Sequence, residues 1–307
     1  MISLAGVLAA HADGVSELAG FSVFANPDLA TLAQGDAKPM RGPEMSTPRF
    51  LSVQTAWVAP GSPAQQAQAL RRWTPAGHPE LKVFMHSNGS DFSRLAQAPS
   101  HSSVQALAKI TVSKSPSLQV SKEEAAKIPI DAPPTMSGQV ANFWMNVLST
   151  RASAGPFSQP AYDHTGQPIR PGDEINGMLR QQPKIQKQFS GLIGGKGDQY
   201  WELLDVDNKG VLTLGASYNR SGAGGSFQAA DVLYYASGGY YAAITLYQMW
   251  PVNVGGKPST LFWRGDMISS AEIAGLAGME RMGAESSVMK DVSRAVRFFR
   301  SDSGGSR

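Results

Sequence analysis

The last third of the chain contains five segments that are dense in Val, Ile, Leu, Tyr and Trp, and this feature constrains the fold most strongly. Short gaps rich in Gly, Asn and Asp separate the segments, which is the composition of tight turns. The segments are Tyr200–Val206, Val211–Arg220, Asp231–Ser237, Tyr240–Trp250 and Ser259–Ile268. Because short turns join antiparallel neighbours, we predict a five-stranded antiparallel meander.

A long amphipathic helix is predicted after the meander, from Ala271 to Phe299. Ser269-Ser270-Ala271-Glu272 is a helix start signal. Apolar residues then recur at helical spacing after one wider gap: Met282, Val288, Met289, Val292, Ala295, Val296 and Phe299. Burying one such side chain stabilises the fold by about 1.5–3 kcal/mol, so we expect this helix to dock onto the sheet.

The N-terminal part reads as a strand, a helix and a second strand. Alternation from Thr47 to Val58 places one set of residues on a single side, as a half-buried strand requires: Leu51, Val53, Thr55 and Trp57. Ser62-Pro63-Ala64-Gln65 then combines a capping serine, a proline at the first helical position and a glutamine at the third. The helix should end near Trp73, and Leu81–Met85 should form the next strand.

The middle of the chain, about residues 90–195, is predicted to be a helical insert within a single α+β domain over residues 13–307. Ser121–Glu124 is a capping box, and an apolar stripe at helical spacing runs from Met136 to Leu148. Another helix is expected from Asp173 to Leu179, with Pro183 interrupting it. Ala154–Pro171 is rich in Gly, Pro, Ser and Gln and reads as a loop.

This order of elements resembles the START-like (SRPBCC) helix-grip architecture. The Ser62-Pro63-Ala64 helix start after a strand, the strand through Thr260–Arg264 and the stripe from Met282 to Phe299 carry the resemblance. It implies an antiparallel meander packed on a long C-terminal helix, with a cavity for a hydrophobic ligand between them. The segment Tyr234–Tyr241 also resembles one found in uncharacterised exported bacterial proteins.

Composition excludes several classes of protein. The 307 residues carry 27 Lys and Arg against 24 Asp and Glu, so the net charge of +3 gives little support for a nucleic-acid partner. The chain has no cysteine, which excludes disulfides, thiolate metal sites and cysteine nucleophiles. No later apolar run has the length of a membrane span.

The N-terminus suggests export to the periplasm or the medium. Ile2–Ala10 is apolar, and Ala10-His11-Ala12 has the A-x-A form of a signal-peptidase site, although the usual basic residues before it are missing. Residues 1–12 are therefore interpreted as the remnant of a signal peptide, and an ordinary N-terminal helix is the alternative.

Catalytic motifs are weak. Asp205–Gly210 begins like a calcium loop, but Lys209 stands where an oxygen ligand is needed, so a hairpin turn explains it better. No cofactor or metal is predicted. His78, Glu80 and His86 are the one concentration of potential metal ligands, and we interpret them as a polar strand border. No histidine has the local pattern of a serine hydrolase.

The candidate ligand site lies on the last strands. Alternation puts Arg264 and Asp266 together on one face of a mostly apolar sheet, where an ion pair is costly without partners. Partners could come from other strands: Glu202, Asp231 and Arg220. These charged residues either form a structural network in which every charge has a partner, or they bind the acidic head group of a ligand. In the second case the ligand-binding residues would be Arg264, Asp266, Tyr235, Tyr247, Trp250 and Leu246.

We therefore expect non-catalytic binding of a hydrophobic or amphipathic, lipid-like molecule between the sheet and the C-terminal helix. One alternative is an envelope protein-interaction module that has no cavity and uses exposed Tyr and Trp. A metal-dependent or serine hydrolase is the other. The oligomeric state is not predicted.

Overall fold

The protein is described here from a computed structural model, and the structure describes residues 14–35, 37, 39–164 and 167–304. The interpreted signal-peptide remnant, residues 1–12, lies outside this described part. Within it, no helix is both long enough and apolar enough to cross a membrane.

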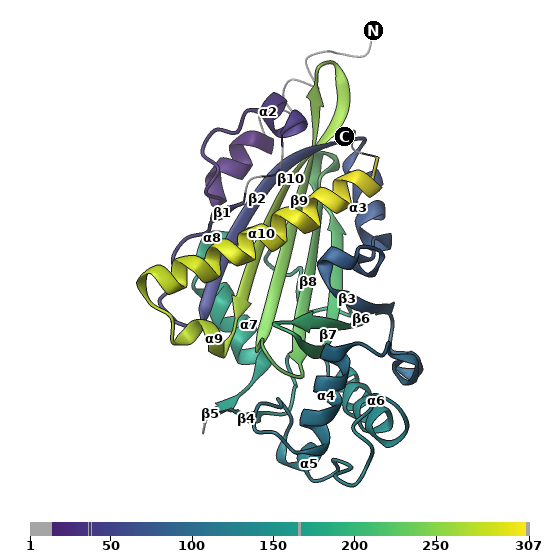
Figure 1. Cartoon of the computed structure of the whole chain (residues 1–307). Coiled ribbons are helices and arrows are strands. Elements are labelled where there is room, and N and C mark those ends of the chain that lie inside the picture. The colour runs from purple at the N-terminus through teal and green to yellow at the C-terminus, as the bar shows by residue number, and fades with distance from the viewer. Residues whose placement is uncertain (1–13, 36, 38, 165–166, 305–307) are drawn as a thin grey trace.

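In the described chain, an eight-stranded antiparallel sheet has the order β1-β2-β10-β9-β8-β7-β6-β3 (Figure 1). The strands are β1 Met40–Arg41, β2 Phe50–Pro60, β3 Val83–Asn88, β6 Asp198–Val206, β7 Lys209–Ser221, β8 Phe227–Ala236, β9 Ala242–Val254 and β10 Lys257–Ser269. The predicted meander is confirmed, because β6 to β10 pair consecutively. β2 pairs with β10, so an N-terminal strand lies beside the C-terminal one.

Tight turns fix the register of the meander. Asp207 and Asn208 join β6 to β7 with φ values of 50° and 63°, in the left-handed region that Asn and Asp tolerate best after glycine. Gly255 and Gly256 join β9 to β10 with φ values of 59° and 78°. Such two-residue turns match the twist of the flanking strands. The calcium-like run is therefore a hairpin turn, as interpreted.

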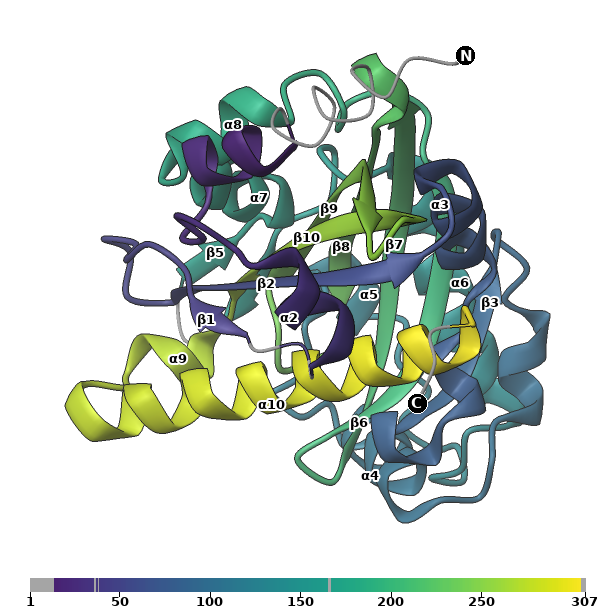
Figure 2. The ribbon, with the colours of Figure 1, turned by 90° about the horizontal axis from the view of Figure 1, so that it is seen from above.

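The C-terminal helix forms in two pieces, α9 Ala271–Ala274 and α10 Gly278–Asp302. α10 lies across one face of the sheet, in front of β2, and its first turns extend past the sheet edge (Figures 1 and 2). Accordingly Met282 is 50% exposed, whereas Val292, Val296 and Phe299 are buried. The chain is thus α+β, with the helix-grip-like arrangement expected from the sequence.

Helices cover the opposite face of the sheet. Residues 14–21 are helical, α7 Pro171–Arg180 contacts β8, β9 and β10, and α4 Ser102–Val112 contacts β7. The remaining helices are α2 Leu29–Gln34, α3 Pro63–Arg72, α5 Lys122–Ala125, α6 Gly138–Ala154 and α8 Pro183–Gln188. A large core lies between the sheet and the helices on this face, and Figure 2 shows the residues 14–21 helix, α7 and α8 on the side away from α10. α3 instead lies on the α10 side, where Ala67 and Leu70 belong to the same apolar cluster as Phe299.

Local sequence signals explain most of these helices. Ser62 and Ser121 each form the predicted capping box at the starts of α3 and α5, and α8 has Pro183 at its first position. The expectation of a loop over Ala154–Pro171 was wrong in part. This stretch contains a short hairpin of β4 Tyr162–His164 and β5 Gln167–Ile169, whose strands are too short to show alternation.

Candidate functional site

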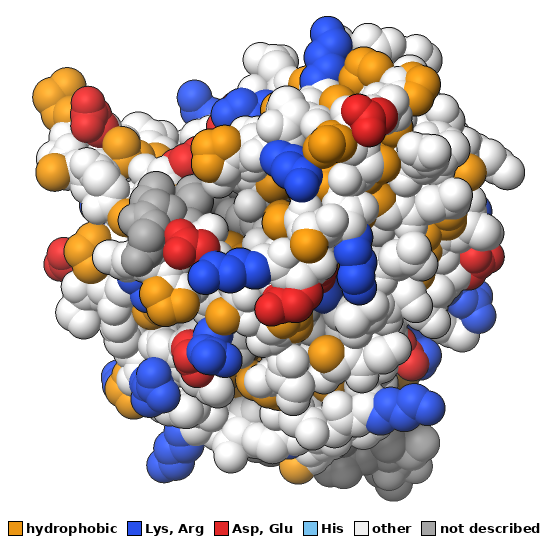
Figure 3. Space-filling view, turned by 90° about the horizontal axis from the view of Figure 1, so that it is seen from below, with side chains coloured by type: hydrophobic (Ala, Val, Ile, Leu, Met, Phe, Trp, Pro, Cys, Tyr) orange, Lys and Arg blue, Asp and Glu red, His pale blue; other side chains and the backbone are white. Residues whose placement is uncertain are grey.

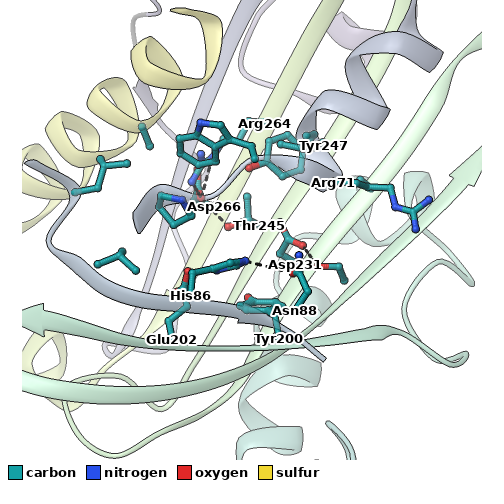
Figure 4. A pocket seen from close by; sticks show the side chains of 18 of the residues that line it. Arg71, His86, Asn88, Tyr200, Glu202, Asp231, Thr245, Tyr247, Arg264 and Asp266 are labelled. Atoms are coloured by element: carbon teal, nitrogen blue, oxygen red, sulfur yellow. Dashed lines mark hydrogen bonds and ion pairs between the residues drawn. The ribbon is translucent and has the colours of Figure 1, made fainter. Parts of the chain in front are cut away.

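A cavity of about 800 Å³ lies between the sheet and α10. Side chains from α3, β3, the five meander strands and α10 line it (Figure 4). The helix therefore closes against only part of the sheet face. Pockets of about 300–1,000 Å³ are the usual size for small-molecule sites in proteins.

Apolar side chains form the wall of the cavity that faces the sheet. They come mainly from α10, from the end of α3 and from the turns after it: Leu70, Trp73, Pro75, Leu81, Val288, Val292 and Ala295. Where α10 does close on the sheet, Phe262 stacks on Trp57 with ring centroids 4.5 Å apart, and Phe299 meets Phe262 edge to face. This aromatic contact seals the junction on the β2 side of the cavity.

A row of polar side chains crosses the floor of the cavity. Register places these residues directly opposite one another on neighbouring strands: Asp198 on β6, Ser217 on β7, Asp231 on β8, Thr245 on β9 and Asp266 on β10. All of them line the cavity. Since every second residue of a strand faces the same side, a row of this kind forms only because five strands are in register.

Arg264 and Asp266 form a buried ion pair at one end of this floor. Arg264 Nη2 donates to Asp266 Oδ1 at 2.7 Å and its Nε donates to Oδ2 at 2.8 Å. Burial alone would lower the pKa of Arg264, because it disfavours the charged guanidinium. The attraction of the adjacent Asp266 carboxylate is stronger than this effect, so the pKa of Arg264 is raised above its ordinary value. The hydroxyl of Thr245 also donates to Asp266, at 2.9 Å.

Asp231 lies in the middle of the polar row. Ser217 Oγ donates to its Oδ1 at 2.5 Å, and Thr245 faces it from β9. Burial raises the pKa of this carboxyl, although the hydrogen bond from Ser217 and the positive charge of Arg264 act in the other direction.

His86 and Glu202 form a second polar pair, between β3 and β6. His86 Nδ1 lies 2.9 Å from Glu202 Oε1, and their side chains are 13% and 16% exposed. Burial by itself lowers the pKa of His86, but the contact with Glu202 outweighs it, so the pKa is raised. The ring of Tyr200 stacks beside His86 with centroids 5.9 Å apart.

Tyr200 reaches this position because its strand partner is Gly215. A Cβ at position 215 would lie 2.2 Å from Cζ of Tyr200, so the phenol ring occupies the space that any other side chain would fill. Burial raises the pKa of Tyr200 well above its usual value.

The structure brings together three of the six predicted ligand-binding residues. Arg264, Asp266 and Tyr247 line the cavity. Leu246, which precedes Tyr247 on β9, points to the opposite face and lies in the large core. Trp250 lies on that same face, where its Nε1 donates to Glu17 Oε2 at 2.8 Å. The alternation of β9 accounts for both positions.

Tyr235 lies outside the cavity because β8 contains a bulge. Gly215 on β7 is opposite Leu233, but the preceding Leu214 is opposite Tyr235, so Tyr234 is an extra residue. A bulge of this kind reverses the alternation that follows it. Tyr235 therefore points into the core, where its ring lies 4.1 Å from the guanidinium carbon of Arg151.

Sequence reasoning missed several cavity residues. The sequence identifies Glu202 and Asp231 only as possible partners of the Arg264 and Asp266 pair. Arg220, the third possible partner, does not line the cavity, and its guanidinium donates to Gln228 and to the Ser190 carbonyl. Ser217, Thr245 and Tyr200 were not singled out. The signal that identifies them is their shared register, which can be read only once the strand pairing is known.

The potential metal ligands do not converge. His78 Nε2 lies 2.7 Å from Asp302 Oδ2, whereas His86 pairs with Glu202. Within the described part of the chain, no three His, Cys, Asp or Glu residues are placed to hold a metal. None of His78, His86 and His101 makes a hydrogen bond with a serine hydroxyl in this part, so no serine nucleophile is paired with them.

Comparisons with known proteins give limited similarity. No protein-family model matches the sequence, and no curated protein matches it. Among solved structures, the chain is similar to a START superfamily protein from Mycobacterium smegmatis, with 14% identity and a TM-score of 0.23. This match covers 32% of the present chain and 61% of the other, so it spans less than two thirds of that protein.

The chain is also similar to Ara h 8.0201, with 9% identity and a TM-score of 0.24, over 45% of the present chain and 89% of the other. The resemblance of Tyr234–Tyr241 to exported bacterial proteins gains no support from these comparisons. The functional proposal therefore depends on the geometry of the cavity itself.

Proposed function

We propose that the protein binds an amphipathic small molecule in the cavity between the sheet and α10. The observation that carries this proposal is a cavity of about 800 Å³ with an apolar wall on the helix side and a polar row on its floor. An apolar chain would lie against Trp73, Val288 and Ala295. A polar end would meet the row through Asp231 and Thr245, since a few placed polar groups are what orient a ligand in an otherwise apolar pocket.

A protein-interaction module without a cavity is less well supported. That alternative needs a closed junction between sheet and helix, and it needs exposed aromatic residues. Every Tyr and Trp of the chain is buried or half-buried. The exposed large apolar side chains of the described residues are instead Met40, Ile130, Phe157, Met279 and Met282.

The face of the molecule seen from below does not suggest a nucleic-acid partner. On the face seen from below, Lys and Arg side chains are interspersed with Asp and Glu (Figure 3). Such mixing does not produce the large basic field that phosphate backbones require. Export stays a prediction from Ala10-His11-Ala12.

Isothermal titration with octan-1-ol, a neutral amphipathic probe, tests the proposal. The unaltered protein should bind it with a stoichiometry of one or more. Ala295→Trp and Val288→Trp place a large ring in the cavity and should reduce the affinity at least about tenfold, which is 1.4 kcal/mol. Ser287→Trp, on the exposed side of the same helix, should change it less than about twofold.

Circular dichroism establishes whether each variant is folded. If the unaltered protein binds no octanol, or if all three variants bind it equally, the cavity is not a ligand site.

A further inference from the structure

The charged side chains that line the cavity can be assigned to pairs, and one carboxylate remains. Arg264 is held by Asp266 at 2.7 Å, and His86 by Glu202 at 2.9 Å. At the rim, Arg71 meets Asp198 at 3.3 Å, and Asp291 meets Arg294 at 3.3 Å. Asp231 is the remaining lining carboxylate, and it makes no ion pair with a described residue.

The free oxygen of Asp231 is available to a ligand. Its Oδ1 accepts from Ser217 at 2.5 Å, whereas no side chain or backbone group of the described residues donates to its Oδ2. An ionised carboxylate can accept about four hydrogen bonds, so this group is far from satisfied. Asp231 is half-buried, and although the charges of Arg264 and His86 act on it from a distance, a carboxylate there with no ion-pair partner and one donor is less well stabilised than in water.

Tyr247 gives a second, independent indication of a ligand. Its side chain lines the cavity and the residue is only 6% exposed, yet its hydroxyl makes no hydrogen bond with any described residue. The Arg264 guanidinium carbon lies 5.6 Å from the centroid of its ring, and register places Tyr247 on the strand next to Asp231, diagonally across from it. The hydroxyl oxygen is not fully enclosed by protein atoms, so it opens onto the cavity, where a ligand can supply the partner that the fold does not.

These observations favour a cationic group over an anionic one. An anionic head group at Arg264 would compete with a bidentate Asp266 and would face the unpaired Asp231. The lining carries five carboxylates, Asp198, Glu202, Asp231, Asp266 and Asp291, against Arg71, Arg264 and the ionisable His86, although the chain as a whole has a net charge of +3. The acidity of the cavity is therefore local and does not follow from the overall composition.

We propose that the polar end of the ligand is a protonated amine, which donates to the free oxygen of Asp231 and is within reach of the Tyr247 hydroxyl. This inference rests on the proposed function, since it names the chemistry of the ligand in the same cavity. Charge-assisted hydrogen bonds from an ammonium group to a carboxylate are about twice as strong as neutral ones. The apolar wall would hold the carbon skeleton of the amine.

Three probes with the same eight-carbon chain test the inference by calorimetry at low salt: octylammonium, octan-1-ol and octanoate. Octylammonium should bind at least about tenfold more tightly than octanol, and octanoate should bind most weakly. Asp231→Asn should reduce the ratio of amine to alcohol affinity about tenfold. Glu280→Gln, which removes the same charge from an exposed site on α10, should leave that ratio unchanged.

The outcomes separate this inference from the proposed function. Tightest binding of octanoate, or an amine preference that persists in Asp231→Asn, would overturn the amine while leaving a ligand cavity in place. Failure of all three probes to bind would overturn both. Asp231→Ser serves as a second variant if Asp231→Asn does not fold, and its expected loss of amine preference is the same.

Discussion

The guanidinium of Arg264 engages both carboxylate oxygens of Asp266, two residues further along the same strand. Their side chains are 15% and 7% exposed, so each charge depends on the other in an environment with little water. Thr245 adds a hydrogen bond to Asp266 from the neighbouring strand. The pair therefore belongs to the structure of the cavity floor, and it does not present a free cation to a ligand.

Removing one partner of this pair should be more harmful than removing both. Asp266→Ala leaves a buried guanidinium without its counter-ion and should lower the free energy of unfolding by about 3–5 kcal/mol. The double variant Arg264→Met with Asp266→Leu should lose much less, because similar apolar volume replaces the pair. Urea denaturation measures both. Equal losses in the single and double variants would contradict the assignment.

The close contact between Tyr200 and Gly215 gives a second prediction. Gly215→Ala forces the Tyr200 ring away from the sheet and into the cavity, at a cost of about 1–3 kcal/mol, as is typical of overpacking. In a Tyr200→Ala background the same substitution should cost much less, because the space is then empty. A thermal-unfolding cycle of the four proteins measures this coupling, and additive effects would show that the two residues do not interact.

The sequence predicts the strands and helices of this protein better than it predicts the cavity. Turn chemistry at Asp207-Asn208 and capping at Ser62 are local signals, and the structure confirms the elements that they delimit. The lining depends on which strands pair and in what register. Three of the six predicted ligand-binding residues face away from the cavity. Leu246 and Trp250 are on the other face of β9 from Tyr247, and the bulge at Tyr234 reverses the alternation in the last part of β8.

Contacts between residues far apart in the sequence are also not predicted by local sequence signals. His86 and Glu202 were both noticed in the sequence, one as a metal ligand and the other as a partner for Arg264. They meet each other because β3 pairs with β6 at the edge of the sheet. Nothing in the residues around either of them indicates this contact.

This His86 and Glu202 pair should make stability depend on pH. The pKa of His86 is raised above its usual 6.5 in the folded protein, so folding favours the protonated ring. The stabilisation is fully present below pH 6.5 and is lost as the pH rises through the folded-state pKa. The free energy of unfolding should therefore fall from pH 6.5 upward, more steeply than in Glu202→Gln. Parallel curves for the two proteins would exclude this coupling.

The proposed amine site predicts that ionised Asp231 lowers the stability of the ligand-free fold, whereas the His86 and Glu202 pair raises stability. Both groups nevertheless make stability fall as the pH rises. Burial raises its pKa above the usual 3.8, so the folded protein holds the proton more tightly than the unfolded chain does. Stability is lost as the carboxyl ionises with rising pH. Asp231→Asn keeps an acceptor for Ser217 but cannot ionise, so at pH 7 the ligand-free variant should melt at a higher temperature than the unaltered protein.

This difference in melting temperature should close as the pH falls below the unperturbed value of 3.8, because the carboxyl is then increasingly protonated in both states. Saturating octylammonium should reverse the order at pH 7, because the amine supplies the missing counter-ion only when the carboxylate is present. Scanning calorimetry with and without the amine measures both effects. If the unaltered protein is more stable than Asp231→Asn without ligand, then Asp231 is satisfied within the fold and needs no cation.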